Sequence, residues 1–293
     1  AVAFCRRWLD GRPNDLTAPL SFNDGSGAPT YCMCPECRKA DDPDPASGAA
    51  RRLCAFANAV AREIAVSHPG KGVGIYAYFW TTVPPLEMTL EPNVSIIYAY
   101  SDGCALHALD DPDCPPNRDV MQRLKQWHRI APRMKLYGYY GLLGDYMGLP
   151  FCSLRKVVDD ARVCADLGMV GSHLDGSSIP GQGLYYWATA QTMWARGESA
   201  ESLRRRYCEG MFGPASGVMV EYYRALEAMC TTPAVHAPRF AWMMPGPLYV
   251  WTDEAIRALN AGLDEASALV TGDSPEARRI EDQKLHVRFA EAF

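Results

Sequence analysis

Acidic residues follow three short apolar runs of the sequence. Asp24, Asp102 and Asp175 each come one or two residues after such a run. Carboxylates paired across a site can serve as general acid and as base or nucleophile at a sugar acetal. Aspartate also caps the backbone in turns after strands, which is the plainer interpretation of any one of them. Taken together, they predict a catalytic pair, Asp24 and Asp175, with Asp102 as the alternative partner.

Aromatic and polar residues accompany these carboxylates at the ends of the apolar runs. Tyrosine and tryptophan offer a flat apolar face with a polar edge, which suits the mixed C–H and hydroxyl surface of a sugar ring. His173 comes two residues before Asp175 and therefore shares its strand face, where it can hydrogen-bond a sugar hydroxyl or the acid itself. The predicted substrate-binding residues are Asn23, Tyr78, Trp80, Tyr139, Tyr140 and His173.

Three of the eleven cysteines lie close together in the sequence, at Cys32, Cys34 and Cys37. A metal site built on these thiolates, with structural zinc as the ion, needs a fourth ligand. The C-x-x-C spacing of Cys34 and Cys37 lowers thiol pKa values and equally allows a redox or disulfide role. As a third alternative, the cysteines only pack a long loop. Candidates for the fourth ligand come from one later loop: Cys104, His107 and Cys114.

The elements that must position these residues alternate between apolar runs and amphipathic stretches. Strands are expected near 18–23, 72–80, 94–100, 134–140 and 168–174, all parallel, with helices between them. Because the runs are continuously apolar, we expect a sheet covered on both faces. About five strand–helix units suit the later part of a parallel (β/α)₈ TIM-type barrel. The alternative is an open doubly wound sheet, but the first strand is not followed by a Gly-rich phosphate turn.

The pattern becomes entirely helical from about residue 183. We therefore predict a partial α/β barrel over residues 1–197 and a C-terminal helical region over 198–293. Thr252 is the expected N-cap of one helix, and Ser274 with Pro275 opens another. The basic cluster Arg204-Arg205-Arg206 is interpreted as a solvated helix face.

Composition excludes two kinds of partner. The net charge is −5 and basic residues form no recurring stripe, which argues against nucleic acid. No apolar run approaches the ~20 residues that a bilayer-spanning helix needs.

The order of several short motifs resembles a known family. The motifs begin with 20–25 and continue through the Cys32, Cys34 and Cys37 cluster, Ala77-Tyr78, Pro92-Asn93-Val94 and the Cys104 to Asn117 loop. They end with Leu149-Pro150-Phe151, Tyr185 to Trp194, and Phe212-Gly213 with Tyr222-Tyr223. Over roughly residues 15–230 the chain resembles the bacterial family called domain of unknown function 4838.

The resemblance implies a fold, an activity and a location. The family is similar to α-glucuronidase-type glycoside hydrolases, which implies an α/β barrel, mostly in secreted bacterial proteins, and hence an extracellular or periplasmic location. It also implies that the first barrel strands precede residue 1. We therefore expect a glycoside hydrolase that acts on uronic-acid-containing oligo- or polysaccharides and needs no cofactor for catalysis. The alternatives are a non-catalytic carbohydrate-binding barrel and a metal or redox protein centred on the Cys32, Cys34 and Cys37 cluster.

Overall fold

The computed structural model describes residues 1–20, 22, 31–85, 87–131, 133–139, 153–174, 179–195, 197–231, 236 and 251–292, without the side chains of 179, 180 and 230. The chain forms two compact units. The sheet unit comprises 1–101, 119–138 and 164–173, and the helical unit comprises 102–118, 139–163 and 174–293. The predicted domain boundary between residues 197 and 198 stays a prediction.

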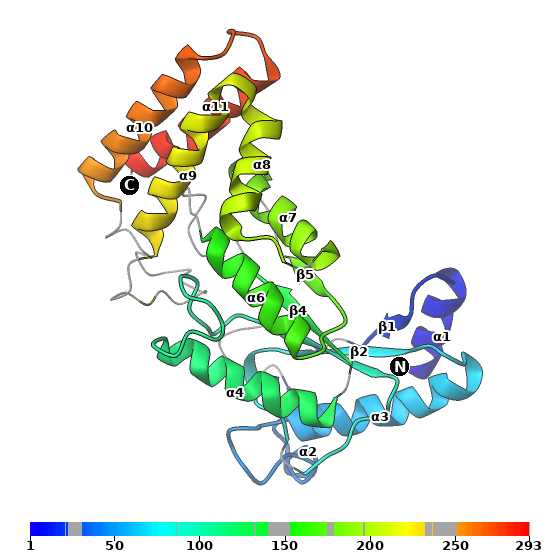
Figure 1. Ribbon diagram of the computed structural model, residues 1–293. Helices are drawn as coiled ribbons and strands as arrows, with labels where there is room; N and C mark the ends of the chain where they lie inside the picture. Colours follow the sequence, from blue (N-terminus) through cyan, green and yellow to red (C-terminus); the bar gives the residue numbers. More distant parts are fainter. Residues whose placement is uncertain are drawn as a thin grey trace. The chain divides into compact units, whose positions relative to one another are not determined.

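Five parallel strands form the sheet of the first unit (Figure 1). They are β1 (Thr17–Pro19), β2 (Gly72–Ala77), β3 (Val94–Ala99), β4 (Met134–Gly138) and β5 (Ser172–Leu174). Their spatial order is β1-β2-β3-β4-β5, the same as their order in the chain. A doubly wound sheet instead reverses its strand order at a switch point. The consecutive order is therefore compatible with part of a barrel, as predicted.

The strands lie where the sequence predicts them but are shorter. The strand β2 ends at Ala77 because the chain then turns into the 3₁₀ helix η1 (Phe79–Thr81). The hydroxyl of Thr81, which is fully buried, accepts a hydrogen bond from the Tyr78 N–H at 3.0 Å and donates one to the Tyr76 carbonyl at 3.1 Å. These bonds fold the strand end back on itself and end the ladder.

The two faces of the sheet differ in burial among the described residues, and the expectation of a sheet covered on both faces stays a prediction. Residues such as Ile75, Ile96 and Leu136 point to one face and are buried. On the other face Ser95 and Ala99 are buried, but a set of larger side chains is half-buried or exposed: Tyr76, Ile97, Lys135, Tyr137 and His173. The apolar runs concealed this alternation because tyrosine and isoleucine occupy part of the open face.

Helices cover the buried face of the sheet unit. The helix α3 (Ala50–Ser67) packs against β2 and β3, and α1 (Val2–Gly11) packs against β1 and α3. On α3, Ala57, Val60 and Ile64 are buried, whereas Phe56 is 47% exposed. The buried face of this helix includes small residues such as Ala57 and Ala61, and small side chains let a helix pack close to a sheet. The unit also contains α2 (Pro35–Arg38) and most of α4 (Pro115–Ile130).

The second unit is built almost entirely of helices. These are α6 (Leu154–Asp166), whose last turn lies in the sheet unit, α7 (Ile179–Trp194), α8 (Ala200–Phe212), the 3₁₀ helix η2 (Gly213–Ala215), α9 (Ser216–Cys230), α10 (Asp253–Ala268) and α11 (Pro275–Glu291). Helix α9 packs between α8 and α10, while α11 contacts α7, α8 and α10. The predicted caps are confirmed, since Thr252 accepts from Ala255 N–H and Ser274 from Ala277 N–H. Within the described chain, no helix is both long and apolar enough to span a bilayer.

Candidate functional site

The end of β2 carries two of the predicted substrate-binding residues, Tyr78 and Trp80, both half-buried. The Trp80 ring packs against Phe22 and Tyr31, with centroids 4.6 and 4.4 Å apart. Between Tyr78 and Trp80, Phe79 has a φ of 47°, in the left-handed region that bulky residues rarely adopt. Backbone strain of this kind concentrates at functional sites, which makes this strand end a candidate.

A row of rings crosses the open face of the sheet toward its carboxyl end. Tyr76 on β2 and Tyr137 on β4 meet edge to face at 6.0 Å, and His173 on β5 stacks on Tyr137 at 4.7 Å with an interplanar angle of 18°. Tyr76 and Tyr137 were not among the predicted site residues. The period-2 alternation within each strand is the signal that would have found them.

The remaining predicted residues divide between the described and undescribed chain. Asn23, Asp24, Tyr140 and Asp175 lie outside the described residues. Asp102 is exposed and Tyr139 is buried, both in the helical unit. The proposed catalytic pair, Asp24 with Asp175, therefore stays a prediction.

The sulfur atoms of Cys32, Cys34 and Cys37 all lie within 4.8 Å of one another. The Cys37 backbone N–H donates to Cys34 Sγ at 3.5 Å. This bond, followed by contacts with the thiols of Cys32 and Cys37, lowers the pKa of Cys34 to about 7. The three sulfurs are therefore close enough for a shared site, and their role as metal ligands or disulfide partners stays a prediction.

A second group of ligand-type side chains lies in the helical unit. Cys104, His107, Cys114 and His236 place one ligand atom each within 4.8 Å of the other three. The sequence placed the first three of these in one loop but did not single out His236. Burial raises the pKa of Cys114 to about 12, so this thiol is protonated at neutral pH unless a cation binds it.

Buried polar side chains hold the 104–109 loop in place. Asn117, which is fully buried, accepts from the Cys104 N–H at 2.8 Å and donates to the carbonyls of His107 and Ala108. The buried ion pair of Lys156 with Asp160 supports the same loop. The Lys156 ammonium donates to the His107 carbonyl at 2.6 Å, and the Asp160 carboxylate accepts from the backbone N–H of Leu109 at 2.7 Å.

A cavity of about 660 Å³ lies in the helical unit beside this loop. Among the described residues, four basic and four acidic side chains line it, so their formal charges cancel. Burial raises the pKa of Asp159, the direction that a general acid needs. The charged residues are Arg155, Lys156, Arg204, Arg224, Asp110, Asp111, Asp159 and Glu227, and the described lining also includes the His107 ring.

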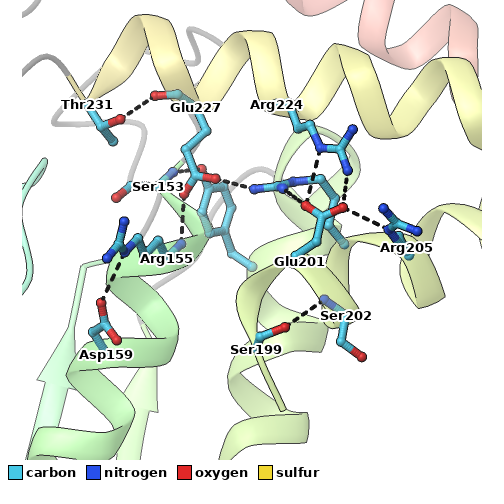
Figure 2. Close-up of polar contacts among 12 residues, drawn as sticks. Ser153, Arg155, Asp159, Ser199, Glu201, Ser202, Arg205, Arg224, Glu227 and Thr231 are labelled. Atoms are coloured by element: carbon cyan, nitrogen blue, oxygen red, sulfur yellow. Dashed lines mark hydrogen bonds and ion pairs between the residues drawn. The ribbon is translucent and has the colours of Figure 1, made fainter.

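Several of these charges form a network between α8 and α9 (Figure 2). Arg204 pairs with Glu201 and Glu227, and its side chain is only 6% exposed. The interpretation of 204–206 as a wholly solvated face is therefore wrong for Arg204, although Arg205 and Arg206 are exposed. Glu227 also accepts from the Arg155 backbone N–H at 2.7 Å, which ties the start of α6 to α9.

These features define an α/β protein with a parallel, consecutively ordered sheet and a helical unit. A family model described as domain of unknown function (DUF4838) matches residues 4–225, so the chain belongs to this family, as the sequence motifs predicted. No curated protein and no solved structure matches the chain.

Proposed function

We propose that the chain is a carbohydrate-active protein of glycoside-hydrolase type, with its saccharide site on the open face of the parallel sheet. The observation that carries the proposal is the ring row of Tyr76, Tyr137 and His173. Rings of this kind, half-exposed on an ordered sheet, provide the flat surfaces on which sugar rings stack. The cavity in the helical unit supports a sugar site less well, because the described residues of its lining include one imidazole and no larger ring.

The second part of the proposal is that this sheet belongs to a (β/α)₈ TIM-type barrel. Successive barrel strands are neighbours and parallel, and active sites lie at their carboxyl ends. The order β1-β2-β3-β4-β5 and the parallel pairing fit this arrangement. The open face then corresponds to the barrel interior, where the ring row borders the catalytic mouth.

The substrate class follows from the charge on the same face. Lys135 precedes Tyr137 by two residues on β4, so both side chains point to the open face, and both are half-buried. Within the described chain Lys135 forms no ion pair. An ammonium group beside a ring platform suits a sugar that carries a carboxylate, which supports uronic-acid-containing saccharides as the substrates.

Catalysis is assigned to the carboxyl groups that follow the strands. Asp175 comes directly after β5, and Asp24 follows β1 by five residues. We assign one as general acid and the other as base or nucleophile, with Asp102 as the alternative partner. No cofactor takes part, because two carboxyl groups suffice for acetal hydrolysis.

Binding and turnover test the proposal separately. Uronic-acid oligosaccharides and their neutral counterparts are titrated calorimetrically into the wild type, Tyr137→Ala and Lys135→Met, with Phe56→Ala on α3 as the matched control. Tyr137→Ala should lower the affinity for both ligands about tenfold. This corresponds to ~1.4 kcal/mol of binding free energy, within the range of an aromatic contact. Lys135→Met should lower the affinity for the charged ligand only. Equal affinities in all variants would contradict the assigned face.

For turnover, Asp24→Asn and Asp175→Asn are assayed on uronic-acid glycosides. Loss of an acid/base residue should cost on the order of 10²–10⁴ in rate. Undiminished rates in both variants would refute the carboxylate assignment. Binding without any hydrolysis by the wild type would instead support a non-catalytic carbohydrate-binding protein.

The Cys32, Cys34 and Cys37 cluster supports a second candidate, a reactive thiol or metal-binding centre. The cluster is accessible at its edge, since Cys34 is exposed, and the pKa of its thiol is about 7. Alkylation of Cys34 by iodoacetamide should therefore follow a titration with a midpoint near this value, well below that of an ordinary thiol. A midpoint in the ordinary thiol range would remove the reason to regard this cysteine as reactive.

A further inference from the structure

We propose that Cys104, His107, Cys114 and His236 form a structural metal site, with zinc as the ion. The group offers two sulfur and two imidazole nitrogen atoms, all within 4.8 Å of one another. A tetrahedral S₂N₂ donor set is characteristic of zinc in proteins. The site is independent of the proposed saccharide face, because all four residues belong to the helical unit.

The distances within the group match those of a coordination tetrahedron. His107 Nδ1 lies 3.4 Å from Cys104 Sγ, and His236 Nδ1 lies 3.5 Å from Cys114 Sγ. With Zn–S near 2.3 Å and Zn–N near 2.05 Å, the sulfur–nitrogen edge of a tetrahedron is roughly 3.6 Å. Two separate S–H···N hydrogen bonds would explain each pair alone. They would not explain why the two pairs converge on one point.

Once a cation is bound, local backbone structure helps to stabilise each cysteine as a thiolate. Cys104 and His107 form a C-x-x-H turn in which the Leu106 N–H donates to Cys104 Sγ at 3.4 Å. Cys114 directly precedes α4, and its carbonyl accepts the first helical bond from Arg118 N–H at 3.0 Å. Its sulfur therefore lies at the positive end of a helix of 16 residues.

The surrounding hydrogen bonds fix the loop before any ion binds. Asn117 joins both halves of the site, since it lies in the first turn of α4 after Cys114 and bonds to the backbone of Cys104 and His107. Ser153 Oγ adds a bond of 3.1 Å to the Leu106 carbonyl. Hydrogen bonds of this kind orient the residues that ligate a metal and raise their affinity for the ion.

The number of ligands indicates the role of the ion. Four protein ligands fill a tetrahedral zinc and leave no position for water or substrate, which is the arrangement of structural sites. The ion would join the 104–107 turn, the start of α4 and His236, which is 122 residues beyond Cys114. Because these segments are distant in the sequence, metal binding should stabilise the fold rather than take part in chemistry.

The test uses the whole 293-residue chain with zinc alone as the probe. A background variant, Cys32→Ser with Cys34→Ser and Cys37→Ser, removes the other thiol cluster so that the metal content refers to this site. The background chain, purified with zinc supplied, should hold about one zinc per chain and lose thermal stability when a chelator removes it. Replacement by Co²⁺ should give the visible absorption of tetrahedral thiolate coordination.

Ligand variants in this background decide the assignment. His236→Ala changes an exposed residue and should lower zinc affinity more than 100-fold, beyond the 10–100-fold typical of supporting residues. Cys114→Ser should do the same, while His128→Ala, an exposed histidine on α4, should keep wild-type zinc binding. The proposal is overturned if the background binds no zinc, if His236→Ala and the control bind equally, or if mass analysis shows a Cys104–Cys114 disulfide.

Discussion

Arg204 on α8 and Glu227 on α9 form an ion pair from which solvent is almost excluded. The two side chains are only 6% and 13% exposed. Arg204 also donates to Glu201 at 2.5 Å, and Glu227 accepts from the Arg155 backbone. The pair therefore connects three helices of the helical unit, and its charges depend on one another for solvation.

Replacing Arg204 with Met should destabilise the protein by about 3 kcal/mol, because Glu227 would keep a buried charge without its partner. The neighbouring Arg205 provides a matched control. It binds the same Glu201 but is 60% exposed, so Arg205→Met should change the free energy of unfolding by less than about 0.5 kcal/mol. Urea unfolding of the two variants measures both values. Similar losses would contradict the assignment of a special role to Arg204.

Asn117 is expected to be as important for the helical unit as the buried ion pair. Asn117→Ala removes three hydrogen bonds of a fully buried side chain, with the Cys104 N–H and with the carbonyls of His107 and Ala108. At about 1 kcal/mol each, the loss should reach about 3 kcal/mol. Asn260→Ala, which removes one bond near the surface of α10, should cost well under half of that. If urea unfolding gives equal values, the Asn117 bonds do not hold the loop as described.

The carboxylate network predicts a defined response to acid. Hydrogen bonds from Arg224, and then from Arg205, lower the pKa of Glu201 from 4.5 to about 2. A group whose pKa is lower in the folded state stabilises the protein above the unfolded pKa and loses that effect as pH falls toward the folded value. The contribution of Glu201 should thus be lost between pH 4.5 and about 2.

The variant Glu201→Gln isolates this effect. Its stability should fall below that of the wild type at neutral pH, and the difference should shrink across this acid range. Because the Glu201 side chain is 38% exposed, solvent screening keeps the difference below about 1 kcal/mol. The exposed Glu209→Gln on α8 serves as the control. The difference in the free energy of unfolding between the wild type and Glu201→Gln should depend on pH. If it does not, the ion pairs of Glu201 contribute nothing to stability.

The sequence predicted those features that depend on local signals. Apolar runs located all five strands, and side-chain caps located the starts of α10 and α11, because a strand core and an N-cap need only adjacent residues. The open sheet face was missed, since Tyr76 and Ile97 continue the apolar runs while pointing away from the buried face.

Long-range relationships could not be predicted in this way. Arg204 and Arg205 are identical in type and adjacent, and only the packing of α9 buries one of them. Likewise, nothing near His236 indicates that it lies beside Cys114, because the fold alone brings these distant positions together.

The sheet offers a last prediction from two glycines of the same strand. A Cβ atom added at Gly72 would lie 1.8 Å from the carbonyl oxygen of Asn93, which is a severe backbone clash. Asn93 cannot easily withdraw, because its side chain donates to the carbonyls of Ala61 and Lys71 and its carbonyl accepts from Val73 N–H. Relief of the clash would therefore shift the β2–β3 pairing itself.

Gly72→Ala should accordingly destabilise the protein by about 3 kcal/mol, at the upper end of the cost of overpacking. Gly74 lies on the open face two residues further along β2, and the atom nearest to an added Cβ is Ile97 Cδ1 at 3.8 Å, an ordinary contact. Gly74→Ala should therefore leave the free energy of unfolding within about 0.5 kcal/mol of the wild-type value. Thermal and urea unfolding of both variants compare a crowded and an uncrowded position on the same face of the strand. A tolerated Gly72→Ala would mean that β2 and β3 are not paired in this register, and a damaging Gly74→Ala would mean that the open face is packed against something.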